Sequence, residues 1–266
     1  MLKLKRILCL LMCFLFMLPI LNKPLASQAD VFDLSDAELG IVKVNQALKD
    51  KKIKVMIQKN NVSYFYDVNN VGQTLPLQMG SGTYKLTLLE YIDSNKYLPK
   101  DSKDIEVKLA DEKLPFLQSA SPIYWDKNGE AAKMAAKLSE NLSTDEQKAY
   151  AIYDYIVKNF EYDKDKVKSL NSNYIPSVEE TLSTKKGICF DYAALYAAML
   201  RSINIPAKLV KGYKNDVSEY HAWNEVYLQN QGWITVDACY DSIMSKSGKA
   251  VSFKKNANEF KKEKEY

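Results

Sequence analysis

Imidazole and guanidinium groups are nearly missing from this 266-residue chain. It contains one histidine, His221, and, after residue 29, one arginine, Arg201. Histidine is the side chain whose ordinary pKa lies near neutral pH, so any mechanism that shuttles protons through an imidazole must be built around position 221. One histidine and no Cys-x-x-Cys pair also exclude zinc-like ligand spacing. We therefore expect neither a metal nor another cofactor.

A hydrophobic run long enough to span a bilayer is also absent. Basic residues precede an apolar stretch of 15 residues, Ile7–Leu21, and small residues follow at Ser27–Ala29. The stretch is shorter than the roughly 20 residues that a membrane helix needs. This layout is typical of a secretory signal peptide at residues 1–29. We expect a secreted or cell-surface protein that would touch a membrane only if this segment stayed uncleaved.

An excess of positive charge is missing once that segment is set aside. Residues 1–29 hold four basic residues and no acidic one, which leaves 33 of the 37 basic residues against 33 acidic ones. A nearly neutral chain carries no electrostatic footprint for nucleic acid. The expected partner is a protein or peptide substrate, peptides of the cell wall included.

Cysteine is scarce as well, because only Cys189 and Cys239 follow the signal segment. In an exported protein, such a pair raises the alternative of a structural disulfide. The competing interpretation is a catalytic thiol with a second, incidental cysteine.

The pattern of apolar residues divides the rest of the chain. Residues 30–50 are mixed in character and predict a linker or short helix. Over residues 51–112, Ile53, Val55 and Ile57 alternate with polar partners, and further strands are expected at 84–91 and 105–109. Turn signals between these strands favour a small β-sandwich-like domain.

Residues 113–266 change to helical periodicity and then to strands. Helices are predicted from about residue 131 to 142, after a capping box at Ser143 and Glu146, near residues 178–182, and from Cys189 to Ile203. Three strands should follow, at 207–213, 221–228 and 233–239. Helices that precede a small antiparallel sheet make this an α+β domain.

Cys189 lies at the predicted start of a helix, directly after Gly187-Ile188. The free amides and the dipole at a helix N-terminus favour a thiolate there. The same amides could hold the oxyanion of a tetrahedral intermediate. Asp191 needs no more than the structural role of an acid in the first turn.

His221 and Asp237 stand on neighbouring predicted strands. A loop of three residues between these strands would pair His221 with Cys239 and make Asp237 its diagonal neighbour, whereas a loop of five would place Asp237 directly opposite. Both registers bring the carboxylate within reach of the imidazole and could fix its orientation. Trp223 is a candidate cover for the site, and Tyr174 a candidate for completing the oxyanion hole.

Four blocks of the sequence resemble the transglutaminase-like superfamily of papain-like cysteine acyltransferases and proteases. They are AIYDYIVKNFEYD from Ala151, GICFDYAALYAAMLRSINIPAKLVKGY from Gly187, HAWNEVYL from His221 and GWITVDACYD from Gly232. The resemblance covers about residues 125–245 and implies Cys189 as nucleophile, His221 as base and Asp237 as the residue that orients it. Asn224, where many members have an apolar residue, and Ala238-Cys239 depart from the pattern.

The resemblance implies a papain-like transglutaminase core behind a small β-rich domain. The expected chemistry is attack of the thiol on an amide bond through an acyl-enzyme, which gives hydrolysis or cross-linking. A catalytically silent cell-surface binding module that keeps the fold is the alternative, because a fold does not by itself imply an activity.

Overall fold

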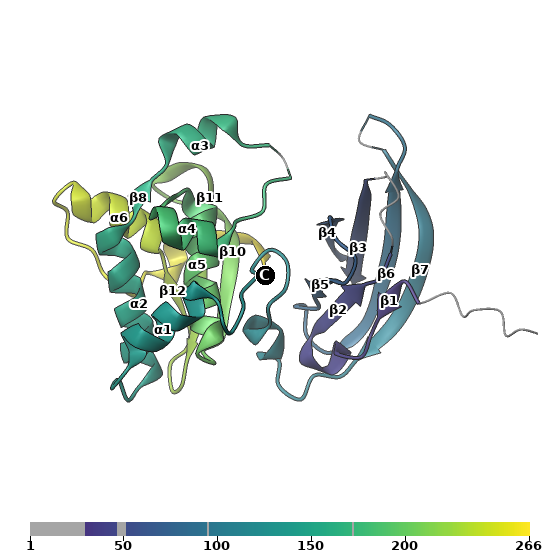
Figure 1. Ribbon diagram of the computed structural model, residues 1–266, viewed down its shortest axis with the longest axis horizontal. Coiled ribbons are helices and arrows are strands. Elements are labelled where there is room, and N and C mark those ends of the chain that lie inside the picture. Colours follow the sequence, from purple (N-terminus) through teal and green to yellow (C-terminus); the bar gives the residue numbers. More distant parts are fainter. Residues whose placement is uncertain (1–29, 47–51, 95, 172) are drawn as a thin grey trace, which may run out of the picture.

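The computed structural model describes residues 30–46, 52–94, 96–171 and 173–266. The predicted signal peptide lies outside these residues. Figure 1 shows a β-rich lobe and a lobe of mixed helices and strands, with the end of the chain between them. Among the described residues, no helix is long and apolar enough to cross a membrane.

The β-rich lobe consists of two antiparallel sheets around one core. One sheet has the order β1-β2-β5 and the other β4-β3-β6-β7. The strands are β1 (Phe32–Asp33), β2 (Ile41–Val44), β3 (Ile53–Lys59), β4 (Val62–Val68), β5 (Gln73–Pro76), β6 (Gly82–Tyr91) and β7 (Tyr97–Val107), with a 3-10 turn at Ala37–Leu39.

Alternation of side chains builds this core. Val55, Ile57 and Leu86 are fully buried, while their neighbours along β3 and β6 are partly or fully exposed at several positions. The prediction of a linker or short helix over residues 30–50 was wrong for the described part, 30–46, because β1 and β2 add a second sheet to the same core; residues 47–50 lie outside the described residues. The strand predicted at 105–109 begins earlier, at Tyr97, and ends at Val107.

The second lobe packs helices against a four-stranded antiparallel sheet of order β12-β11-β10-β13. Its helices are a 3-10 turn at Leu114–Leu117, α1 (Glu130–Ser139), α2 (Asp145–Asn159), α3 (Lys164–Ser169), α4 (Val178–Thr184), α5 (Cys189–Ser202), α6 (Ala238–Lys246) and a 3-10 turn at Ala257–Glu259. Its strands are β8 (Glu161–Tyr162), β9 (Lys186–Gly187), β10 (Ala207–Lys214), β11 (Val217–Leu228), β12 (Gly232–Val236) and β13 (Phe260–Glu265). This confirms the predicted α+β class, with a β-rich region before it.

Helix α5 forms the centre of this lobe. Every residue from Ala194 to Leu200 is fully buried, because α5 packs against the sheet on one side and against α1, α2, α4 and α6 on others. Four alanines lie among the first ten residues of the helix and let neighbouring elements approach its backbone closely. The nucleophile candidate at its first residue therefore stands on a rigid support.

Among the boundaries in this lobe that differ from the sequence prediction, two concern helix caps. The capping box of α2 is formed by Thr144 and Gln147, one residue later than predicted. The strand predicted at 233–239 ends at Val236, and α6 begins at Ala238 with Asp237 as its N-cap. Aspartate is among the strongest N-cap residues, since its carboxylate accepts from the free amides of the first turn.

The two lobes meet along β13 and the residue that follows it. Tyr266 packs edge-on against Tyr64 and Tyr66 of β4, with ring centroids 5.6 and 6.2 Å apart. The Lys264 ammonium donates to the Ser63 carbonyl at 2.8 Å, and the Tyr64 hydroxyl accepts from the Glu265 amide at 3.2 Å. A strand of the second sheet is thus fastened to the β-rich lobe.

Arg201 ties three separate segments together at the far end of α5. Its guanidinium is buried and donates to the carbonyls of Ala207, Gln118 and Tyr266 at 3.0, 2.8 and 3.0 Å. These acceptors belong to β10, to the segment between the lobes and to the residue after β13. Burial lowers the pKa of Arg201 to about 9.

Replacing Arg201 with methionine should destabilise the fold by about 3 kcal/mol or more. Three charge-assisted hydrogen bonds are lost, each worth about 1.5–3 kcal/mol before relaxation. Urea unfolding followed by tryptophan fluorescence measures the change, with the exposed Lys137→Met on α1 as the matched control. A loss below about 1 kcal/mol would show that Arg201 does not connect the segments energetically.

Candidate active site

Cys189 is the first residue of α5 and follows a short parallel pairing of β8 with β9. Gly187 is required just before it, because a Cβ there would lie 2.6 Å from the Cβ of Asp191. The extended backbone of Ile188 then turns the chain into the helix. Cys189 is partly exposed, and its backbone amide belongs to the first turn, whose amides have no partners within a helix.

Asp191 fixes this turn from inside the protein. Its fully buried carboxylate accepts from the Ile188 amide at 2.8 Å and pairs with Lys166 of α3 at 3.1 Å. The Tyr174 hydroxyl donates to the other carboxylate oxygen of Asp191. Asp191 therefore does more than balance the helix dipole. The Tyr174 hydroxyl thus binds Asp191 and supports the turn that carries the nucleophile. The predicted role of Tyr174 in an oxyanion hole stays a hypothesis.

His221 and Asp237 lie together, as predicted. The His221 Nε2 and Asp237 Oδ2 atoms are 2.7 Å apart, and both side chains are buried. Strands β11 and β12 use the register of the three-residue loop, with Leu228 opposite Gly232. The second oxygen of Asp237 accepts from the Tyr240 amide at 3.0 Å. The carboxylate is therefore held by α6 while it orients the imidazole.

The charge of this pair is set by its surroundings. Burial lowers the pKa of His221. The charge and hydrogen bond of Asp237, together with the Cys189 side chain beside the ring, outweigh this effect and raise the pKa from 6.5 to about 10. The imidazole is thus protonated at neutral pH. Since Nε2 faces Asp237, Nδ1 is the nitrogen left for the thiol.

Trp223 lies beneath the imidazole as a buried support. The two rings are nearly parallel, with centroids 6.3 Å apart, and the Phe260 ring of β13 also packs against the indole, with centroids 5.0 Å apart. Gly212 stands opposite His221 on β10, where a Cβ would lie 2.0 Å from the Lys261 carbonyl and 3.0 Å from Trp223. The glycine allows β13 and Trp223 to close around the histidine strand.

Asn224 connects the strand of the histidine to the helix of the cysteine. Its buried side-chain amide donates to the Ala193 carbonyl of α5 at 2.9 Å and to the Lys208 carbonyl of β10 at 3.0 Å. An apolar residue could not make these bonds. Asn224, which departs from the family pattern, therefore positions β11 relative to α5.

A mainly apolar cavity of about 440 Å³ opens beside the pair of Cys189 and His221. Its wall includes Tyr162, Tyr220 and Tyr240, with Cys239 at its base. Cys189 and Cys239 are both free thiols, so the alternative of a disulfide between them is absent from the structure. Burial raises the pKa of the Cys239 thiol well above its usual value, which makes it a poor nucleophile.

Lys211 is a neighbour of the thiol that the sequence did not reveal. Its ammonium lies 3.2 Å from the centroid of the Phe190 ring, next to Cys189 in the chain. Burial lowers the pKa of Lys211 to about 8, although the charge of Cys189 opposes this shift. No motif marks this lysine, since only the fold brings β10 beside the start of α5. Across the described residues, no three His, Cys, Asp or Glu side chains are grouped to hold a metal.

Comparison with known proteins agrees with this geometry. Residues 132–238 match the family model of the transglutaminase-like superfamily. The match contains Cys189, His221 and Asp237 together with α2, α5 and the first three strands of the second sheet. The second lobe is therefore a transglutaminase-like core, and the resemblance read from the sequence blocks is confirmed.

Curated relatives share parts of this core. The chain is 32% identical over 124 residues to the uncharacterized protein YebA of Bacillus subtilis, which covers 39% of the chain and 16% of that protein. It is 38% identical over 69 residues to a protein-glutamine gamma-glutamyltransferase of Pseudomonas aeruginosa. This alignment covers 21% of the chain and 10% of the relative. The matched segments are thus small parts of much longer proteins.

Among solved structures, a proposed cysteine protease from Cytophaga hutchinsonii aligns with a TM-score of 0.43 and 21% identity. The alignment covers 72% of this chain and 65% of that one.

Replacing Asn224 with leucine tests whether this residue positions the histidine strand relative to the cysteine helix without taking part in the reaction. Two buried hydrogen bonds are lost, which should cost about 1–3 kcal/mol of stability. Because His221 is three residues away on the same strand, we also expect slower alkylation of Cys189 by iodoacetamide at pH 7. The control is Thr181→Val on α4. It also removes a buried hydrogen bond, but one that does not connect β11 with α5. Equal alkylation rates in Asn224→Leu and the wild type would contradict this role.

The His221–Asp237 pair predicts a specific pH dependence of stability. The pKa of His221 rises from 6.5 to about 10 on folding, so its stabilising contribution is complete below about pH 6.5 and is lost as the pH rises through 10. The free energy of unfolding should fall across this range, by at most about 1.4 kcal/mol per pH unit from this one proton. Asp237→Asn should flatten the slope. Parallel slopes for the two proteins in urea titrations from pH 6 to 10 would count against the pair.

Proposed function

We propose that this chain is an exported thiol enzyme that cleaves or exchanges amide bonds of protein or peptide substrates through an acyl-enzyme thioester. The observation that carries the proposal is the convergence of three elements. The first residue of α5 supplies a thiol, β11 supplies an imidazole, and the N-cap of α6 supplies the acid 2.7 Å from that imidazole. Peptides of the cell wall belong to the substrate class that an exported enzyme would meet.

The first half of the reaction uses Cys189 and His221 as an ion pair. The thiolate attacks the carbonyl carbon of the amide, and a C–S bond forms while the carbonyl oxygen gains negative charge. The free amides at the start of α5 face this oxyanion, in the manner of an oxyanion hole. His221 then gives its proton to the departing nitrogen, the C–N bond breaks, and ammonia or an amine leaves a thioester behind.

The second half restores the enzyme. Neutral His221 takes a proton from the incoming nucleophile, which attacks the thioester carbon and releases the Cys189 thiolate. Water as nucleophile gives hydrolysis, and a lysine amine gives an isopeptide cross-link. The apolar cavity beside the thiol is large enough to admit either acceptor. The name of the Pseudomonas aeruginosa relative, a protein-glutamine gamma-glutamyltransferase, supports testing both acceptors.

Cys189→Ala should abolish turnover while leaving the free energy of unfolding within about 1 kcal/mol of the wild type, because the side chain is small and partly exposed. One assay measures ammonia release from a library of blocked glutamine peptides, with and without an added primary amine. A second assay measures the new amino groups that cleavage of peptide bonds produces. Cys239→Ala is the matched control and should keep turnover. A Cys189→Ala protein with wild-type turnover would overturn the proposal.

Alkylation distinguishes an enzyme from a silent binding module that keeps the fold. A thiol in an ion pair with His221 should react with iodoacetamide well below about pH 8, whereas an unactivated thiol should react only near its ordinary pKa. Inertness of Cys189 at pH 6–7, together with no turnover, would favour the binding module.

A further inference from the structure

A second, smaller cavity is lined by Phe190, the residue after Cys189. It has a volume of about 110 Å³ and is bounded by Phe190, Tyr174 and Lys211 of the transglutaminase-like core and by Tyr66 and Asp67 of the β-rich lobe. Lys211, which lines this cavity, is near enough to Cys189 for the charge of the thiolate to act on it, so a substrate bound to the thiol lies close to the cavity. Its volume fits a group of side-chain size.

Lys211 gives this cavity a positive charge without a carboxylate partner. Among the described residues, no carboxylate lies within 4 Å of its ammonium, and its close contacts are the faces of Phe190 at 3.2 Å and Tyr266 at 5.8 Å. By contrast, the buried Lys208 of the same strand is paired with Glu265 at 3.0 Å. Asp67, which also lines the cavity, is already paired with Lys54 at 2.6 Å.

The charge of Cys189 is the one anion that acts on Lys211 from nearby. Formation of a thioester removes that charge, because the sulfur becomes neutral when the C–S bond forms. Lys211 then lies in a partly buried cavity without a counter-charge, which is unfavourable unless the bound acyl group brings one.

We propose that the cavity of Lys211 recognises a carboxylate of the substrate, so that the enzyme prefers acidic acyl donors. This inference rests on the proposed function and names its substrate class. The carboxylate can come from an acidic side chain beside the reacting amide or from a free chain end. Both present the same chemistry to Lys211.

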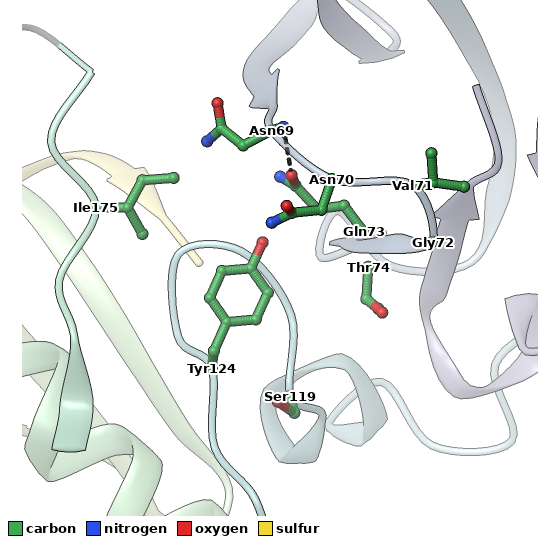
Figure 2. A pocket seen from close by; sticks show the side chains of 9 residues that line it. All are labelled: Asn69, Asn70, Val71, Gly72, Gln73, Thr74, Ser119, Tyr124 and Ile175. Atoms are coloured by element: carbon green, nitrogen blue, oxygen red, sulfur yellow. Dashed lines mark hydrogen bonds between the residues drawn. The ribbon is translucent and has the colours of Figure 1, made fainter. Parts of the chain in front are cut away.

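A larger cavity adjoins that of Lys211 between the lobes. Ile175 borders both the Lys211 cavity and the larger one of about 480 Å³. Figure 2 shows this larger cavity, with Ile175 on one side, the loop of Asn69 and Asn70 on the other, and Tyr124 between them. Its polar lining is neutral, which suits a peptide backbone more than a second charged group.

The first experiment uses a matched pair of alkylating agents and needs no substrate. Iodoacetate and iodoacetamide both form an S–C bond with Cys189 and release iodide, but only the former carries a carboxylate. Lys211→Met should lower the ratio of iodoacetate to iodoacetamide rates about tenfold, and Lys211→Arg should keep most of it. The surface control is Lys158→Met on α2, whose ammonium lies on an exposed helix face.

The second experiment identifies the source of the carboxylate with three peptides that each contain one glutamine. One has glutamate on both sides and an amidated end, one has alanine neighbours and a free terminal carboxylate after glutamine, and one is neutral. The wild type should have a kcat/KM about tenfold higher for one of the acidic peptides. Lys211→Met should reduce the ratio of kcat/KM for this acidic peptide to that for the neutral peptide from about ten to about one.

The outcomes separate this inference from the proposed function. If Cys189 is alkylated rapidly and peptides are turned over, but the acidic preference is absent or survives Lys211→Met, the inference is wrong and the enzyme assignment stands. A uniform loss for all peptides and for iodoacetamide would instead show that Lys211 acts on the thiol, which also overturns the inference. Without turnover, the alkylation ratio still decides the inference, whereas the proposed function fails.

Discussion

The carboxylate of Asp237 serves two groups at once, the backbone at the start of α6 and the imidazole of His221. One oxygen caps the first turn of α6 and the other holds His221 at 2.7 Å, so neither the helix nor the imidazole can shift without breaking a buried hydrogen bond. A buried acid that served only one of these groups would be left with an unsatisfied oxygen. Because both oxygens are used, the carboxylate is held in place beside the ring, where it raises the pKa of the imidazole.

The thiol side of the site depends on a comparable arrangement around Asp191. This residue holds the backbone before Cys189, accepts from Tyr174 and pairs with Lys166. Asn224 then fixes the distance between the two halves by linking β11 to α5. The reacting groups are thus placed by buried polar residues that do not themselves react, on a helix whose packing leaves it no freedom to move.

The β-rich lobe contributes to the site through its position and not through reacting groups. Tyr64 and Tyr66 hold the end of the chain, and Asp67 completes the cavity in which Lys211 lies. In Figure 1 the two lobes stand side by side with the C-terminal residue between them. Under the proposed function, the residues that react lie in one lobe and the cavity of Lys211 lies between the two.

Local patterns in the sequence were sufficient for the main elements. Alternation in Ile53, Val55 and Ile57 and the spacing of Ala149, Ile152 and Ile156 reflect burial of one face, which depends on near neighbours in the chain. The triad candidates also followed from the sequence, since only one histidine was available and a short hairpin limits the partners of a strand residue.

The sequence did not predict features that depend on competition or on distant contacts. The segment at 233–239 has strand-like residues, but the capping strength of Asp237 ends the strand at Val236. Ile41–Val44 forms a strand because its partner, β5, lies some thirty residues further along the chain. Lys211 resembles any polar residue of a half-exposed strand, and only the packing of β10 beside α5 and the β-rich lobe gives it a site. Sequence by itself determined which groups could react, because residue type fixes chemistry. Tertiary structure decided which of them are charged, buried and near one another, because those properties arise from atoms far apart in the chain.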